Sequence, residues 1–262
     1  MMMYHVVVIG GGPCGATAAH DPATAGRTVA MLDRAGRIKP CGGAIPPRLI
    51  SDFNIPASQI VARILTARMI SPTQRAVDIP IENGFVGMVD RENFDEFLRL
   101  RASAGLAGCE TIRREGVPIP LRPMDRWDNG RDVVLAGDAA GVVAPSSGEG
   151  IYYGRVGGRV AATVAQALLA SGKARDLKLA RKRFMKEHGM VFRVLRSMQD
   201  ACYKSDERRE RFVSLCHDVD VQRLTFDAYM NKRLVRAHPM AHIRIGLKNL
   251  AHLLRLVPTG HT

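Results

Sequence analysis

The stretch Val6-Val-Val-Ile-Gly-Gly-Gly-Pro-Cys-Gly15, near the N-terminus, decides the expected fold. Its first four residues form a β-branched apolar run, which predicts a short buried strand. The turn that follows has the spacing Gly10-x-Gly12-x-x-Gly15 and leads into small residues. We therefore predict a strand, a tight glycine-rich turn and a helix in immediate succession.

A second strand follows this helix. Residues 16–25 are helix-compatible, although Pro22 should break their later part, and Gly26 should end the helix. The run Thr28-Val-Ala-Met-Leu-Asp33 is again apolar and ends in an acid. Strand, helix and strand together predict a βαβ unit with two parallel strands.

This context gives the glycine pattern a chemical meaning. Gly10 permits the tight turn, Gly12 lets the backbone approach a pyrophosphate, and Gly15 lets the helix pack closely on the strand. The N-terminus of the helix that follows the turn favours anionic phosphates. Asp33 can accept hydrogen bonds from an adenosine ribose. The pattern predicts a dinucleotide site; the alternative is a glycine-rich turn without a ligand.

A second motif lies far along the chain. The run Asp132-Val-Val-Leu-Ala136 predicts a third buried strand, and it leads into Gly137-Asp138-Ala139-Ala140-Gly141. Small residues allow close approach of a ligand, and Asp138 is an acceptor for hydroxyls of a sugar-like chain. The run Gly148-Glu149-Gly150-Ile151 then opens a helix whose free N–H groups favour an anionic oxygen. Taken alone, the second motif favours a strand-to-helix turn capped by Asp138. Together with the first glycine motif, it predicts a ligand-binding site.

The composition fits one or two globular domains. Of the 262 residues, 46% are hydrophobic and 24% are charged. The net charge of +13 favours an anionic partner, which would be a phosphate-bearing ligand, a lipid surface or nucleic acid. Aromatic residues are only 5% and no nucleic-acid-binding motif occurs, so we predict no nucleic-acid partner. Nothing in the sequence indicates an oligomeric state.

Neither a membrane span nor a metal or disulfide framework is expected. No apolar run reaches the length of about 18 residues that a spanning helix needs, and the N-terminus lacks a signal-peptide pattern. The five cysteines are odd in number and share no CxxC spacing, and the eight histidines show no HExxH spacing. This pattern favours a reducing, cytoplasmic compartment and no metal.

The two motifs, Asp90-Arg91 and the loop Pro40-Cys41-Gly42-Gly43 together resemble flavin-dependent oxidoreductases of the para-hydroxybenzoate hydroxylase fold. The chain resembles in particular the geranylgeranyl reductases of chlorophyll and bacteriochlorophyll synthesis. The resemblance covers nearly the whole chain and is most specific in the segments 34–48, 126–132, 137–145 and 226–232. It implies an α/β fold with a Rossmann-like, glutathione-reductase-like FAD-binding domain, a reduced substrate domain and a basic helical C-terminal region.

The resemblance implies FAD as the cofactor. Adenosine would lie near Asp33, pyrophosphate near the first glycine motif, and the isoalloxazine beside the loop that ends at Ile151. Arg91 matches the family arginine that contacts the cofactor. The positions that match cofactor-binding residues are Gly10, Gly12, Pro13, Gly15, Asp33, Arg34, Gly42, Arg91, Gly137, Asp138, Gly148, Gly150 and Ile151.

The implied reaction reduces isolated double bonds of a geranylgeranyl chain to give a phytyl group. The chain would be carried by a diphosphate or by a (bacterio)chlorophyll ester. NADPH or another donor would supply the electrons through the flavin. Cys41 is the candidate proton donor, the alternative being a small loop residue tolerated for space. An FAD-dependent aromatic monooxygenase shares these cofactor motifs and is the alternative enzyme.

The chain departs from the family in its middle. A segment of domain size, about 100 residues or more, has no counterpart, and the seam falls near residues 102–106. The third FAD signature, a short Gly-Ala-Asp-Gly motif, falls in it. We expect residues 1–172 to form the FAD-binding domain, with truncated substrate-domain insertions at about 44–123. Weakened FAD affinity and low turnover are the expected consequences.

Residues 173–262 are expected to form a basic helical region. Apolar residues recur at three- and four-residue steps from 243 to 257, with cations between them, which predicts an amphipathic helix. This pattern favours peripheral docking on an anionic photosynthetic membrane, the alternative being a solvated helix face. A flavin-free, membrane-associated remnant is the non-enzyme alternative.

Overall fold

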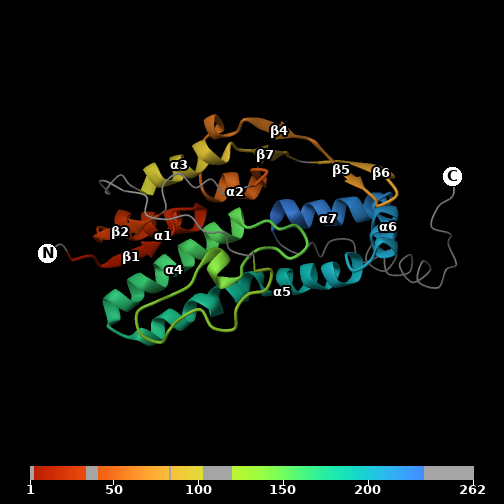
Figure 1. Ribbon diagram of the computed structural model, residues 1–262. Helices are drawn as coiled ribbons and strands as arrows, with labels where there is room; N and C mark the ends of the chain where they lie inside the picture. Colours follow the sequence, from red (N-terminus) through yellow and green to blue (C-terminus); the bar gives the residue numbers. More distant parts are fainter. Residues whose placement is uncertain (1–2, 34–40, 83, 103–119, 233–262) are drawn as a thin grey trace. The chain divides into compact units, whose positions relative to one another are not determined.

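The computed structural model describes residues 3–33, 41–82, 84–102 and 120–232 (Figure 1). Two compact units make up the chain. The first combines the residues up to Gly43 with Val89–Gly189, and the second combines Ala44–Met88 with the residues from Met190 onward. Residues 173–189 therefore belong to the first unit; the predicted domain boundary at residue 172 stays a prediction.

The first unit contains the predicted βαβ arrangement. Strands β1 (Val6–Ile9) and β2 (Val29–Leu32) are parallel, and α1 (Pro13–Thr24) connects them. The helix runs through Pro22, so the expected break there is wrong. The proline forfeits one backbone hydrogen bond, to the carbonyl of Ala18, but the helix ends two residues later, at Thr24, so little of it lies beyond the proline. Gly26, with φ of 77°, ends the helix as predicted.

Further helices of this unit pack around α1. They are α3 (Arg91–Ala102), α4 (Ile151–Ser171), the first half of α5 (Leu179–Cys202) and the short 3₁₀ helices η2 (Gly137–Ala140) and η3 (Ala174–Lys178). Helix α4 approaches α1 closely because Gly158 has no side chain: a Cβ there would overlap the carbonyl oxygen of Cys14.

A buried aromatic group forms part of the core of this unit. The rings of Trp127 and Phe184 lie 5.3 Å apart, and Phe184, Tyr153 and His188 follow at 4.9–6.3 Å from one another. All four side chains are almost completely buried. Trp127 also donates from Nε1 to the carbonyl of Met124 at 3.0 Å. This group fixes the segment 124–127 on α4 and α5.

The sequence overstates the strand content of the first unit. Residues 132–136 form no strand; Val134 makes one isolated bridge with Asp128, and Val133 is exposed. The backbone of residues 127–129 pairs with only part of this run: Leu135 donates its N–H to the Trp127 carbonyl at 2.7 Å, and Asn129 donates to the Val133 carbonyl at 3.2 Å. A single bridge results, not a ladder of strand length. Strand β1 is only partly buried: Val6 and Val8 are partly buried, and Val7 and Ile9 are exposed.

The second unit places strands against short helices. Its strands are β3 (Ala44–Ile45), β4 (Ala62–Ile64), β5 (Thr66–Ile70), β6 (Ala76–Pro80) and β7 (Val86–Met88), arranged as an antiparallel sheet β3-β7-β4 and a hairpin β5-β6. The helices are α2 (Pro47–Asp52), η1 (Ala57–Gln59), α6 (Asp206–Leu215) and α7 (Val219–Asn231). Short alternating runs between residues 60 and 89, such as Ala76-Val-Asp-Ile79, predict strands, and β4 to β7 confirm this prediction.

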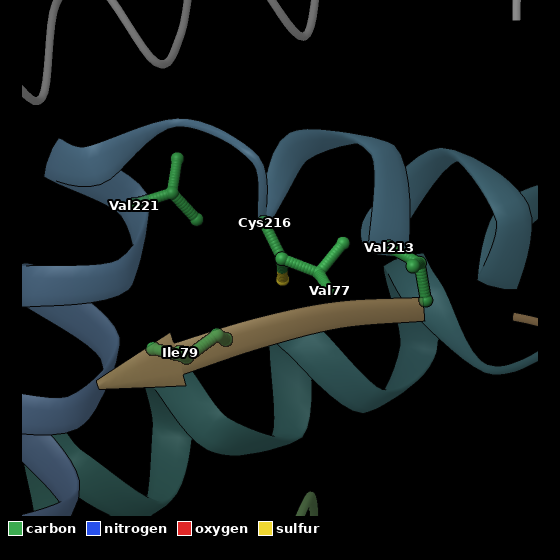
Figure 2. Close-up of a cluster of buried hydrophobic side chains, with 5 residues drawn as sticks. All are labelled: Val77, Ile79, Val213, Cys216 and Val221. Atoms are coloured by element: carbon green, nitrogen blue, oxygen red, sulfur yellow. The ribbon is translucent and has the colours of Figure 1, made fainter. Parts of the chain in front are cut away.

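Alternation along β6 builds the core of this unit. Val77 and Ile79 are buried, whereas Ala76, Asp78 and Pro80 are exposed. Figure 2 shows these two side chains facing Val213 of α6, Cys216 directly after α6, and Val221 of α7. The predicted amphipathic helix at 243–257 and the predicted seam near 102–106 both lie outside or at the border of the described residues.

One ion pair ties the hairpin to α6 and makes this unit sensitive to acid. Partial removal from water opposes ionisation of Glu210, but hydrogen bonds from Arg75 (2.7 Å) and from the Thr73 backbone N–H (2.6 Å) outweigh it and lower the pKa to about 2. Because the folded-state pKa is lowered, the stabilisation is present above the unfolded pKa of about 4.3 and is lost as the pH falls towards 2.

We therefore expect Glu210→Gln to destabilise the protein at pH 7 and to lose most of that effect only near pH 2. Urea unfolding midpoints at pH 7, 4.5, 3 and 2 measure this. Asp206→Asn, which removes an exposed pair with Arg209, is the control and should change little at any pH. A Glu210→Gln deficit that is the same at pH 7 and pH 3 would contradict the assignment.

Candidate functional site

The first glycine motif forms a turn in which Gly10, Gly11 and Gly15 leave no place for another residue type. Gly10 has φ of 104° and donates its N–H to the carbonyl of Leu32 at 2.7 Å. A Cβ on Gly15 would overlap the Gly10 carbonyl oxygen, and a Cβ on Gly11 would overlap the carboxylate of Asp33. These close approaches bring the end of β2 onto the turn, so Asp33 lies where the sequence predicts it.

The start of α1 leaves room and donors for an anion. Gly12 is the N-cap, Pro13 is the first helical residue, and no side chain caps the helix. A Cβ on Gly12 would meet nothing within 4 Å. The first N–H groups of a helix have no partner within the helix, so this end is open to a negatively charged ligand.

The structure brings the second motif onto the first. Gly137 has φ of 58°, and a Cβ there would come within 2.8 Å of both Cβ and Sγ of Cys14 in α1. Asp138 lies next to the start of α4, because a Cβ on Gly150 would stand 3.4 Å from its Oδ1. Residues more than 120 positions apart in the chain thus meet at the N-terminal ends of α1 and α4.

Sequence reasoning missed the role of Glu149. This side chain is buried, and its Oε1 accepts a hydrogen bond from the backbone N–H of Tyr152 at 2.7 Å. One of the helix N–H groups expected to face an anion is therefore already bound. An acid directly before a helix is the sequence signal that could have indicated this cap. Gly148, with φ of 68°, faces open space, and Ile151 is buried.

Arg91 lies in a second group of site residues, at the start of α3. Its buried guanidinium donates from Nε to Asp95 Oδ1 (3.1 Å) and from a terminal nitrogen to Oδ2 (2.7 Å). Burial alone would lower the pKa of Arg91, but hydrogen bonds with Asp95 and with the thiol of Cys41 raise it. Sequence reasoning did not foresee that Asp95 binds this arginine, although the i, i+4 spacing is the signal for it.

Backbone pairing holds Cys41 near this arginine. Val89 donates its N–H to the carbonyl of Gly43 at 2.9 Å, and Gly43, with φ of 70°, leaves no room for a Cβ beside Val89. Cys41 is exposed, and a Cβ on Gly42 would meet nothing within 4 Å. The structure therefore places an exposed thiol beside a buried cation. Arg34 lies outside the described residues.

The described cysteines should differ widely in reactivity. Burial, together with the charge of Asp138, raises the pKa of Cys14 to about 12, and burial raises that of Cys216 to about 11. We expect iodoacetamide at pH 8 to label Cys41 first and to label Cys14 and Cys216 at least about a hundredfold more slowly, since the thiolate is the reactive form. Peptide mapping over time measures the rates; comparable labelling of Cys14 would contradict the packing of α1 on η2.

No helix in the described part of the chain is long and apolar enough to cross a bilayer. No group of three or more histidine, cysteine, aspartate or glutamate side chains is arranged there to hold a metal ion.

Comparison with known proteins gives the family. The family model described as pyridine nucleotide-disulphide oxidoreductase matches residues 4–213. A geranylgeranyl diphosphate reductase of Rhodobacter capsulatus is 46% identical over 391 aligned positions, which cover all of both chains. A protein of the same name from Synechocystis is 42% identical over 162 residues, or 60% of this chain and 40% of that one.

Solved structures agree on the fold. A geranylgeranyl bacteriochlorophyll reductase-like protein from Thermoplasma acidophilum is 14% identical, with a TM-score of 0.58 over 92% of this chain and 95% of that one. The halogenase PltM is 12% identical, with a TM-score of 0.60 over 98% and 93%. These structures confirm the predicted α/β oxidoreductase fold, and the sequence matches place this chain in the geranylgeranyl diphosphate reductase family, within the pyridine nucleotide-disulphide oxidoreductases.

Proposed function

We propose that this protein is an FAD-dependent reductase of the geranylgeranyl chain, acting on geranylgeranyl diphosphate or on geranylgeranylated (bacterio)chlorophyll. The observation that carries the proposal is the identity of 46% to a geranylgeranyl diphosphate reductase over the whole length of both chains. The meeting of the two glycine motifs at Cys14 and Gly137 supports it independently, because a dinucleotide cofactor needs both helix ends together.

The residues present fit FAD. The uncapped start of α1, with open space before Gly12, suits a pyrophosphate, and Asp33 beside Gly11 suits the adenosine ribose. Asp138, close to Gly150, is an acceptor for the ribityl hydroxyls. Gly10, Pro13, Gly15 and Gly137 shape this cradle. The other expected contacts are Arg34, Gly42, Arg91, Gly148, Gly150 and Ile151.

When bound, a reduced flavin supplies the electron pair for one carbon of the alkene. The other carbon needs a proton, and Cys41 Sγ is the exposed acid in the described part of this loop. The Arg91 guanidinium, fixed by Asp95, places a positive charge next to that sulfur and stabilises the negative charge left after proton transfer. Cys41 can then recover a proton from water.

The proposal also covers the electron donor, the form of the substrate and the location of the protein in the cell. NADPH or another donor would reduce the flavin. The surplus of basic residues supports peripheral binding of this cytoplasmic protein to an anionic photosynthetic membrane, where an insoluble pigment ester resides. An aromatic monooxygenase and a flavin-free, membrane-associated remnant are the rival functions.

The difference in length bears on activity. The alignment with the Rhodobacter protein has 391 positions and this chain has 262 residues, so a long stretch of the relative has no counterpart here. In this shorter chain, Val7 and Ile9 of β1 are exposed, and residues 132–136 form a single bridge instead of the predicted strand. We propose that FAD affinity and turnover are lower than in a full-length relative.

The visible spectrum of the purified chain, with the released cofactor identified, is the first test. Flavin bands and FAD are expected; geranylgeranyl diphosphate with NADPH under anaerobic conditions should then yield reduced products by mass spectrometry. Oxygen-dependent hydroxylation of an aromatic compound would favour the monooxygenase. A folded, colourless chain that ignores added FAD but binds anionic liposomes would favour the remnant.

A further inference from the structure

Asp33 is held in place by packing as well as by its position in the chain. It follows β2, and its carboxylate lies directly over Gly11, where no Cβ would fit. Its side chain is 26% exposed, so it is accessible to a ligand and yet partly removed from water. A partner that holds this carboxylate in one orientation favours binding. A side chain that rotates freely would have to give up that freedom, at an entropic cost, when the ligand binds.

The partner comes from α3. Arg99 Nη1 lies 3.5 Å from Asp33 Oδ2, and Arg99 Nε donates to Glu96 Oε2 at 2.9 Å. The guanidinium is thus held between two carboxylates, one on its own helix and one at the dinucleotide turn. Helix α3 packs against α1, which keeps this arrangement beside the glycine motif. The Arg99 side chain is 27% exposed, so salt screens the pair less than it would screen a fully solvated one.

We propose that Arg99 is a positioning residue for Asp33 and thereby sets the selectivity of the site for the adenosine half of FAD over a flavin that lacks it. The inference rests on the proposed binding of FAD. Arg99 pairs with one carboxylate oxygen and leaves the other as an acceptor for the ribose hydroxyls. A charge-assisted pair of this kind orders the acceptor before the ligand arrives, so its benefit appears only for a ligand that carries the ribose.

The test uses the full chain freed of flavin, with Kd measured for FAD and for FMN by fluorescence titration. Arg99→Gln should raise the Kd for FAD about three- to tenfold, because the ion pair that orients the Asp33 carboxylate is lost, and leave the Kd for FMN unchanged. Arg99→Lys, which keeps the charge, should recover part of the loss. In an Asp33→Asn background, Arg99→Gln should have no further effect on FAD binding.

Arg196→Gln is the matched control, since it removes an exposed i, i+4 pair with Asp200 on α5. If Arg99→Gln does not fold, Arg99→Met, which keeps the apolar stem, replaces it. Unchanged FAD binding, equal weakening of FAD and FMN, or an additive effect with Asp33→Asn would each overturn the inference. A wild-type chain that takes up no FAD would overturn the proposed function as well. If the wild-type chain binds FAD and the Arg99 variants do not behave as expected, only the role of Arg99 is overturned.

Discussion

Replacing Gly15 by alanine is expected to disrupt the dinucleotide turn and to abolish FAD uptake. The new Cβ would overlap the carbonyl oxygen of Gly10, which belongs to rigid backbone and cannot move aside. Separating α1 from β1 to relieve the overlap should destabilise the first unit by about 3 kcal/mol or more. Thermal unfolding by circular dichroism and the flavin content of the purified variant measure the two effects.

Two matched glycine variants separate folding from binding. Gly12→Ala should fold normally, because its Cβ would meet nothing within 4 Å, but should lose FAD affinity if a pyrophosphate occupies that space. Gly189→Ala, within α5, should leave FAD binding unchanged and raise stability by up to about 1 kcal/mol. A Gly15→Ala variant as stable as Gly189→Ala would refute the close approach of α1 and β1.

Truncating Phe184 should be the most destabilising core substitution in the first unit. Its ring lies between Trp127 and His188 and is 1% exposed. Phe184→Ala is therefore expected to cost about 3–5 kcal/mol, from lost burial and the cavity left behind. Because Trp127 is the single tryptophan, its fluorescence during urea unfolding reports this unit directly.

Leu169→Ala on α4 is the control for this substitution. Leu169 is 37% exposed, so its truncation should cost less than about 1 kcal/mol. Similar losses for the two variants would mean that the aromatic group is not the core of the first unit. A red shift of the Trp127 emission in folded Phe184→Ala is also expected, since water would reach the indole.

Local patterns were sufficient for much of the fold. The glycine spacing and the apolar runs predicted β1, α1 and β2, and alternation predicted β6, because steric limits on a turn and the side-chain period of a strand act over a few residues. The same reasoning overpredicted a strand at residues 132–136. A strand requires hydrogen bonds from a distant neighbour, and no local pattern reveals whether that neighbour is present.

The sequence by itself determined the βαβ unit, the glycines that only fit as glycines, and the family to which the chain belongs. Only the tertiary structure decided that Gly137 rests on Cys14, that Arg91 is held by Asp95 beside Cys41, and that α6 packs on β6. It also decided that Arg99 faces Asp33, a pairing of residues 66 positions apart. Such pairings depend on how helices pack, which is set by burial and shape over the whole unit rather than by the residues beside each group in the chain.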